Sequence, residues 1–518
     1  MSSSNTRRRT SPSPSQNDDH QSIDIDYHMN YNKNNSTDNQ LNDDTDSSTE
    51  DGNLSMQMWI QQLFFSKDSP NLLLLTFLYV VQGIPMGLVF GALPFLLKQN
   101  LAYWQIGVFA LSGYPYSLKL LWSPIVDSCF FASFGRRKTW IVPMQFISGF
   151  TMIWLSYSID QWMSDGDLNI YSFTFVFTLL VFCCATQDVA VDSLAIALLP
   201  VHKRALCSTV QTLGLQIGFF SSSSIFLALN SVDFCNNYLR WHAASEPLLS
   251  LSHYFWFWGW LFVLFTVYLC VAFKEPAPPA APLGALAVYR QALQVIQLKP
   301  VQRLAFVLLF VKLGLIVFDA ATLLILLDKG FGTSNVALFA IIDFPLQILI
   351  ALFAARYSSG DRPLSPYRVA FVARIVAGVG GAVLVYFYPV GPPSFFWFAL
   401  MLLGSLLYSF GSNVMFVAQG AFFARITDDS IAGTYLTLLN TISNLGGTLW
   451  KPFVLAAIDT FSTQCDGCQK SNGYYTVAAL SLIYSVIFLF VGIDNILLPL
   501  QLLPRERFVT HSSSNDNV

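Results

Sequence analysis

Twelve long apolar segments determine what this chain can fold into. A helix needs about 20 apolar residues to cross the hydrocarbon core of a bilayer, and each segment is near that length. Charged residues make up only 11% of the 518 residues, whereas soluble domains have about 25%. The composition therefore predicts an all-α membrane protein. The expected spans are approximately residues 71–97, 104–126, 139–159, 171–199, 205–229, 253–273, 303–327, 335–355, 369–388, 395–423, 431–458 and 474–497.

The first part of the chain, from Met1 to about Met56, has the composition of a solvated tail. It is rich in serine, asparagine and aspartate and has almost no large apolar residues, so it cannot bury enough surface to fold. The first apolar run begins near Asn71, which is too late for a cleavable signal peptide. We therefore expect a disordered cytosolic tail over residues 1–56 and a first span that acts as the signal anchor.

The distribution of basic residues over the connecting loops predicts the orientation of the spans. If the N-terminal tail is cytosolic, most lysines and arginines fall in loops on the cytosolic side. The opposite loops hold only four basic residues, Lys98, Arg240, Lys329 and Lys470. This asymmetry places both termini in the cytosol.

A connection rich in proline and alanine divides the spans into two sets of six. It continues into a short amphipathic helix, so it predicts a hinge. The sets echo each other, since Tyr114-Pro115 in the second span matches Phe344-Pro345 in the eighth. Such a repeat resembles the major facilitator fold, in which the solute binds between the halves near the bilayer midplane. The predicted six-helix halves are residues 57–273 and 303–498. Residues 274–302 are the predicted cytosolic linker, and residues 499–518 the predicted cytosolic tail.

The loop between the second and third spans combines an aspartate, a glycine and three basic residues. Its sequence, LKLLWSPIVDSCFFASFGRRKTWIVPMQ (118–145), resembles the cytoplasmic latch of major facilitators, in which an aspartate faces arginines beyond a glycine turn. The alternative is an ordinary positive loop, which requires neither the aspartate nor the glycine. The predicted latch residues are Asp127, Gly135, Arg136, Arg137 and Lys138, with Asp127 expected to contact Arg136 or Arg137.

Two aspartates of the fourth span, Asp188 and Asp192, are candidates for gating. They are four residues apart and so share one helix face. An ionisable group in hydrocarbon is costly, which suits a proton relay or an ion pair between helices. The alternative, which we favour, is that they pair with Lys203, Arg204 or the latch loop near the cytosolic end of the span.

Four cations inside the spans predict a cavity for an anionic solute. For Lys451 and Arg374 the alternative is that they snorkel to the bilayer surface, but Lys119 is more than a turn from either end of its span. An unpaired Lys119 would be strongly desolvated, so we expect a carboxylate partner, Asp319 or Asp343. The candidate solute-binding residues are Lys119, Tyr114, Tyr116, Gln187, Gln211, Lys312, Arg374, Asn440, Asn444 and Lys451.

Motifs for catalysis, metal binding and nucleic acid binding are lacking in the sequence. It has no G-x-S-x-G elbow, H-E-x-x-H or P-loop, and no basic patch with interleaved aromatics. Cys465-x-x-Cys468 has no second ligand pair, so we expect a lumenal disulfide involving Cys235 rather than a metal site. We therefore expect no enzyme, no cofactor and no nucleic acid partner.

Several longer motifs resemble one eukaryotic family, the acetyl-coenzyme A (acetyl-CoA) transporters of the endoplasmic reticulum membrane. They are LKLLWSPIVD (118–127), FGRRKTWIVPMQ (134–145), ATQDVAVD (185–192), VDFCNNYLR (232–240) and AGTYLTLLNTISNLGGTLWK (432–451). The patterns QD-x-x-x-D and LK-x-x-W-x-P-x-x-D resemble bacterial muropeptide permeases more distantly. The resemblance implies a twelve-span antiporter that moves acetyl-CoA into the lumen in exchange for coenzyme A and so supplies lumenal acetylation.

The charge pattern agrees with this solute without selecting it. Coenzyme A carries a charge of about −4 near neutral pH. The guanidinium of Arg374 can bind a phosphate through two hydrogen bonds, but the four cations would suit any bulky organic anion. The alternatives are a proton-coupled permease for another large solute, such as a muropeptide-like compound, and a non-transporting membrane scaffold. The expected partners are the solute and membrane lipid, and the oligomeric state stays open, with a homodimer as one option.

Overall fold

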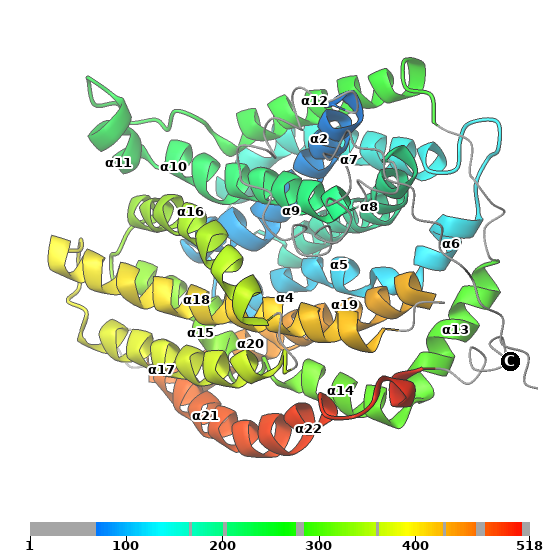
Figure 1. The fold of residues 1–518 in the computed structure, drawn as a ribbon. Helices are drawn as coiled ribbons and strands as arrows, with labels where there is room; N and C mark the ends of the chain where they lie inside the picture. Colours follow the sequence, from blue (N-terminus) through cyan, green and yellow to red (C-terminus); the bar gives the residue numbers. More distant parts are fainter. Residues whose placement is uncertain are drawn as a thin grey trace, which may run out of the picture. The chain divides into compact units, whose positions relative to one another are not determined.

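The computed structural model describes residues 69–164, 168–199, 205–275, 284–358, 362–427, 431–462 and 472–509. All regular elements in these ranges are helices (Figure 1), which confirms the predicted all-α class. The described residues belong to one structural unit, Gln62–Val518. The predicted N-terminal tail lies outside them, as do Lys203, Arg204, Cys465 and Cys468.

The first six spans are helices that begin and end close to the predicted bounds. The second is the least regular, because Pro115 and Pro124 each start a new helical segment. α11 (Val232–Phe234) and η6 (Cys235–Leu239) follow the fifth span. The spans are α2 (Ser69–Gly87), η1 (Leu88–Ala92) and α3 (Leu93–Lys98); α4 (Tyr103–Ala110), η2 (Leu111–Gly113), α5 (Tyr114–Leu118), η3 (Lys119–Leu121) and α6 (Ser123–Ser128); α7 (Lys138–Ser164); α8 (Ile170–Leu198); α9 (Ala205–Phe220), η5 (Ser221–Ile225) and α10 (Phe226–Asn230); and α12 (Leu251–Val271).

The last six spans follow the predicted linker helix, α13 (Ala285–Gln297), which meets the next helix at an angle of 87°. They are α14 (Lys299–Phe310) and α15 (Ile316–Asp328); α16 (Thr333–Ser358); α17 (Ser365–Phe387); α18 (Phe395–Ile426); α19 (Ala432–Thr448) and α20 (Lys451–Phe461); and α21 (Asn472–Phe488), η8 (Leu489–Leu497) and α22 (Leu498–Leu500), after which comes η9 (Arg505–Phe508).

Seven helical segments in the described ranges are long and apolar enough to cross a membrane without interruption. The other five predicted spans are also helical. Two of them, α7 and α16, are continuous, whereas the second, seventh and eleventh spans are interrupted near Trp122, at residues 311–315 and at residues 449–450. Each predicted span therefore corresponds to helical structure, but three are built from two or more pieces.

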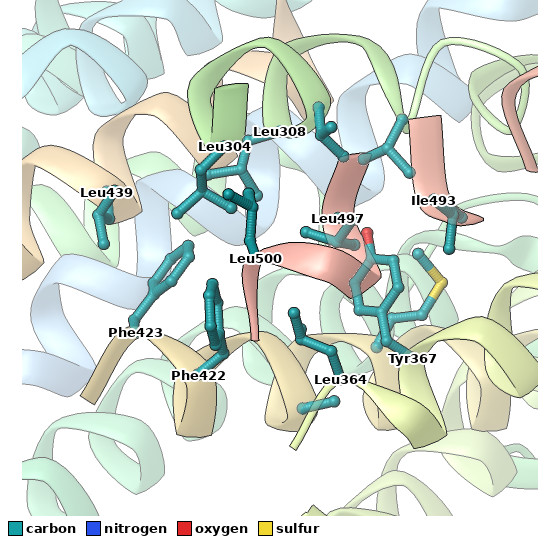
Figure 2. Packing of buried hydrophobic residues seen from close by; sticks show 14 of the residues in the cluster. Leu304, Leu308, Leu364, Tyr367, Phe422, Phe423, Leu439, Ile493, Leu497 and Leu500 are labelled. Atoms are coloured by element: carbon teal, nitrogen blue, oxygen red, sulfur yellow. The ribbon is translucent and has the colours of Figure 1, made fainter. Parts of the chain in front are cut away.

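A large apolar cluster holds the C-terminal half together (Figure 2). Its side chains come from α14, α17, α18, α19 and the last helical segments, and they point into one shared space. Leu500 is 2% exposed and Phe508 is fully buried in this cluster. The packed structure therefore extends to residue 509, beyond the predicted boundary at residue 498. Residues labelled in the figure include Leu304, Leu308, Phe422, Phe423 and Leu497.

In the N-terminal half, α2 and α9 approach each other closely through glycines. A Cβ atom on Gly83 would lie 2.5 Å from the carbonyl oxygen of Leu215, and one on Gly218 would lie 2.1 Å from that of Val80. Small residues allow such backbone contact between membrane helices. The close packing brings polar side chains of α2 and α9 against the charged face of α8.

Candidate functional site

The three lysines predicted inside the spans all lie where a helix is interrupted. Lys119 is the first residue of η3, Lys312 lies in the turn between α14 and α15, and Lys451 is the first residue of α20. Interrupted helices expose backbone polar groups in the membrane, and transporters use them to build solute and ion sites. The sequence identified the lysines, and the structure adds that each one marks a break.

Lys119 forms an ion pair with Asp188 of α8 inside the N-terminal half. The side chain of Asp188 is 1% exposed and that of Lys119 is 16% exposed, and the ring of Tyr116 lies 5.0 Å from the ammonium nitrogen. The predicted partners, Asp319 and Asp343, are wrong. Both belong to the other half, whereas α8 packs directly on η3 and supplies a carboxylate at the depth of Lys119.

Asp192 lies one turn after Asp188 and is held by two uncharged donors. The hydroxyl of Tyr79 donates to its carboxylate at 2.8 Å, and the amide of Gln211 donates at 2.7 Å. The favoured prediction, that both aspartates pair with the latch loop or with Lys203 and Arg204, is wrong for Asp188. For Asp192 the structure gives Tyr79 and Gln211 in place of the latch loop, and the two loop cations lie outside the described residues.

In the C-terminal half, Arg374 of α17 binds Asp319 of α15. Its Nη2 atom lies 2.6 and 2.9 Å from the two carboxylate oxygens, and the ring of Tyr408 lies 4.5 Å from the guanidinium carbon. Lys312 is within electrostatic range of Arg374, Asp319 and Lys451. Among the described residues, Asp319 is therefore ion-paired with Arg374, Lys451 lines a cavity together with Asp319, and the ammonium of Lys312 donates to the carbonyl oxygen of Ser443 at 3.2 Å. Arg374 is only 7% exposed, so the snorkelling alternative is wrong for it.

Two cavities meet at Asp319. One, of about 590 Å³, is lined by Phe90 and Ile106 from the N-terminal half and by Asp319 and Lys451 from the C-terminal half. The other, of about 700 Å³, lies within the C-terminal half and is lined by Asp319, Tyr408 and mainly apolar residues. A solute between the halves would therefore meet Lys451 and Asp319 together.

The remaining predicted solute residues are not gathered around these cavities. Tyr114 donates its hydroxyl to the Leu449 carbonyl oxygen across the two halves at 2.8 Å. The amide nitrogen of Gln187 is buried without a partner in the described structure, and Gln211 is occupied by Asp192. Asn440 is exposed and Asn444 is half-buried. The structure thus divides the predicted cationic cavity into a Lys119 network and an Arg374 cluster.

Two residues of the Arg374 cluster were not placed there by sequence reasoning. Asp319 was identified as an intramembrane charge but was expected to pair with Lys119. Nothing in the sequence marks Tyr408 as a site residue, because an aromatic residue inside an apolar span usually packs against other apolar side chains.

The predicted contact between Asp127 and Arg136 is present, with 3.4 Å between the carboxylate oxygen and Nη2. The structure adds Glu275, which the sequence did not suggest because it follows the sixth span. Its carboxylate accepts hydrogen bonds from the backbone nitrogens of Arg137 and Lys138 at 3.0 and 3.1 Å. A Cβ at residue 135, where φ is +111°, would lie 2.5 Å from Glu275, so this turn requires the predicted glycine.

We expect Asp127→Asn to lower transport turnover more than solute binding, because it weakens the contact with Arg136 without touching either cavity. Burial raises the pKa of Asp127, and the Arg136 guanidinium opposes that shift. The carboxylate therefore gains its proton at a higher pH than an ordinary aspartate, so mild acid should weaken the parent contact and leave Asp127→Asn unaffected. Initial uptake rates and equilibrium binding, each measured across pH, check this. An unchanged rate with lost binding would contradict the latch.

At the opposite end of the bundle, carboxylates of the C-terminal half hold the start of α4. Asp328 accepts hydrogen bonds from Lys98 and from the hydroxyl of Tyr103, both at 2.6 Å. Asp459 accepts from the backbone nitrogen of Trp104 at 2.6 Å, in addition to the Gln105 side chain of α4 itself, which accepts from the backbone nitrogen of Ala102 at 3.0 Å. A residue from one half thus caps a helix of the other. We call this region the Lys98 end and the latch region the Arg136 end.

The predicted disulfide at Cys235 is not formed. Cys235 is a free, fully buried cysteine, and its sulfur lies 3.3 Å from the carbonyl oxygen of Leu229. Cys465 and Cys468 lie outside the described residues. Within the described ranges, no group of three or more potential ligands could hold a metal ion.

Comparison with solved structures supports the transporter fold. A bacterial homologue of the human lysosomal transporter Spinster, in an inward-facing conformation, matches with a TM-score of 0.59 and 15% identity, covering 86% of this chain and 98% of that one. The nucleoside transporter NupG matches with a TM-score of 0.58 and 13% identity, covering 82% and 98%. At such identities the likeness shows the fold alone.

Comparison with protein families and curated sequences identifies relatives over most of the chain. An uncharacterized membrane protein of Saccharomyces cerevisiae is 34% identical in an alignment that covers 79% of this chain and 87% of that protein. An uncharacterized protein of Schizosaccharomyces pombe is 37% identical, covering 75% and 74%. The anhydromuropeptide permease of Escherichia coli is 27% identical over about a third of each chain, 31% and 32%. The family model described as acetyl-coenzyme A transporter 1 matches residues 71–286, 280–365 and 360–483, so this chain belongs to the acetyl-coenzyme A transporter family.

Proposed function

We propose that this protein carries acetyl-CoA from the cytosol into the endoplasmic reticulum lumen in exchange for coenzyme A, and so supplies acetyl groups for lumenal acetylation. The observation that carries the proposal is that Asp319, which is ion-paired with Arg374, lines a cavity between the halves together with Lys451, with Lys312 close enough for its charge to interact with theirs. Membership of the family supports the choice of solute. The protein acts as a transporter, and we propose no catalytic role.

The cluster suits a polyanion because its cations outnumber its carboxylate. A coenzyme A molecule carries about −4 near neutral pH. We propose that Asp319 occupies Arg374 when solute is absent and that a solute phosphate replaces the carboxylate. Arginine is suited to this exchange, because its planar fork binds carboxylate and phosphate with similar geometry.

The contacts between the halves indicate how solute reaches the cluster. Asp328 and Asp459 join the halves at the Lys98 end, and Tyr114 and Ser117 join them on the Arg136 side of the cavity through Leu449 and Thr448. We propose that the Lys98 end is closed here and that solute enters from the Arg136 end when the contacts of Tyr114 and Ser117 part. The basic loops favour a cytosolic position for the Arg136 end, which we adopt in this proposal. Lys119, which is occupied by Asp188, belongs in this proposal to the frame of the N-terminal half rather than to the solute site.

Uptake of radiolabelled acetyl-CoA into proteoliposomes tests the proposal. Vesicles preloaded with coenzyme A should take up label faster than empty vesicles, and added salt should weaken binding because charges in a wet cavity are screened. A panel of other organic anions should compete poorly. Uptake that is unaffected by internal coenzyme A would contradict exchange, and saturable uptake of another anion in preference to acetyl-CoA would contradict the solute.

A second candidate is a proton-coupled permease for a muropeptide-like solute. The local similarity to the anhydromuropeptide permease favours it. A muropeptide that enters under an imposed proton gradient, while acetyl-CoA does not, would establish this alternative. A non-transporting scaffold would instead lose its role when residues 1–56 are removed, whereas a transporter should keep its flux.

A further inference from the structure

The larger cavity has a polar end and an apolar end. It lies between α15, α17 and α18, and Phe339 of α16 also lines it. Asp319 and Tyr408, which both contact Arg374, line one part of it. Leu326 and Met401 line another part. Asp319 also lines the cavity between the halves, so the polar end adjoins the proposed solute path.

The lining residues run along the three helices for a similar distance. From Asp319 to Leu326 on α15, and from Met401 to Tyr408 on α18, the separation is seven residues, or about 10 Å at 1.5 Å per residue. α15 continues from Leu326 to Asp328 at the Lys98 end. The cavity is therefore a slot that leads away from the cation cluster toward the Lys98 end, and we call it the C-half slot.

Glycines keep the C-half slot open. Gly381 of α17 and Gly404 of α18 line it. A Cβ atom on Gly381 would meet no atom within 4 Å, and one on Gly404 would meet only the side chain of Leu384, at 3.8 Å. Helix packing at these two positions therefore does not require glycine, and small side chains there leave the slot empty.

We propose that the C-half slot receives the uncharged acyl end of the thioester and that it admits acyl chains longer than acetyl. This inference rests on the proposed function. In the proposed function the phosphates of a coenzyme A compound lie in the cavity between the halves, beside Lys451, and the uncharged pantetheine arm and acyl end continue past Asp319 into the slot. Its far end, at Leu326 and Met401, is apolar and suits an alkyl chain. Burial of each further methylene should strengthen binding.

A pair of neighbouring glycines on α17 allows a matched test. Gly381→Leu should fill the slot without displacing backbone. Gly380→Leu places the same side chain one residue away, on an exposed position that does not line the slot and where a Cβ also meets nothing within 4 Å. Coenzyme A and its acetyl, butyryl and hexanoyl thioesters are then used to inhibit labelled acetyl-CoA uptake by the parent and both variants.

In the parent and in Gly380→Leu, the inhibition constant should fall about threefold for each added methylene. In Gly381→Leu the chain-length dependence should vanish or reverse, while unacylated coenzyme A should inhibit as it does in the parent. If Gly381→Leu is poorly folded, Gly404→Ala should flatten the same series in part.

Several results would overturn the inference. The inhibition constants could depend on chain length equally in Gly381→Leu and the parent, or not at all in the parent. Either result would indicate that the slot holds a membrane lipid chain or no ligand. Equal loss of inhibition by coenzyme A and by its thioesters in Gly381→Leu would show that the slot does not recognise the acyl end. Failure of coenzyme A to inhibit the parent at all would contradict the proposed function itself.

Discussion

Replacement of Arg374 by alanine should weaken acetyl-CoA binding at least about 30-fold and reduce uptake to match. Arg374 is nearly buried and bonded to Asp319, and truncation of one partner in such a charge pair costs roughly 2–5 kcal/mol. Arg374→Lys keeps the charge but loses the fork, so it should be intermediate. Equilibrium binding and initial uptake rates measure both effects.

The same helix supplies a control for Arg374. Arg368 of α17 binds Asp494 at 2.6 Å, but its side chain is 44% exposed, and exposed pairs contribute little. Arg368→Ala should therefore bind and transport like the parent. Asp319→Asn should bind more tightly than the parent, because it removes the carboxylate that competes with phosphate for Arg374. A folded Arg374→Ala protein with parental affinity would show that the anion site lies elsewhere.

Replacement of Lys119 by methionine should destabilise the N-terminal half by about 3–5 kcal/mol. The change leaves Asp188, which is 1% exposed, as a buried carboxylate without its cation, and breaking a buried pair on one side has a cost of this size. The double variant Lys119→Met with Asp188→Asn should recover much of the loss, because neither charge then remains. Thermal unfolding in detergent, followed by tryptophan fluorescence, compares the two.

This double-variant comparison separates a structural pair from a solute site. Acetyl-CoA affinity in the folded double variant should stay near that of the parent, because Lys119 lies outside the Arg374 cluster. Equal stability of the single and double variants would mean that the pair has little coupling. Lost affinity with unchanged stability would return Lys119 to the solute site.

The sequence predicted the helical spans and the local contacts better than it predicted the partners of buried charges. Span positions follow from apolar length, and the Asp127–Arg136 contact joins residues nine apart. The Lys119–Asp188 pair joins residues 69 apart. Which of several intramembrane carboxylates faces a lysine depends on helix packing and rotation, and a single sequence does not encode these in any local pattern.

The positions of helix breaks and of the end of the folded chain also depend on packing that a single sequence does not reveal. Pro124 makes the break after Lys119 visible in the sequence, but the turn around Lys312 contains no proline. It holds Gly314, where a Cβ would lie 2.1 Å from the Ser485 hydroxyl oxygen of α21. The burial of Phe508 in the C-terminal cluster likewise depends on distant helices, so composition alone marked that segment as tail.

The contacts at the Lys98 end differ in kind from those inside each half. Asp328 is 40% exposed, so its ion pair with Lys98 belongs to the class that contributes at most about 1 kcal/mol. The cap that Asp459 provides to α4 is of similar size, and water can replace either contact when the halves part. The ion pairs of Lys119 and Arg374 have no such replacement. The chain thus keeps its buried ion pairs within the halves and contacts that water can replace at the Lys98 end, so that one half can rock against the other while neither unfolds.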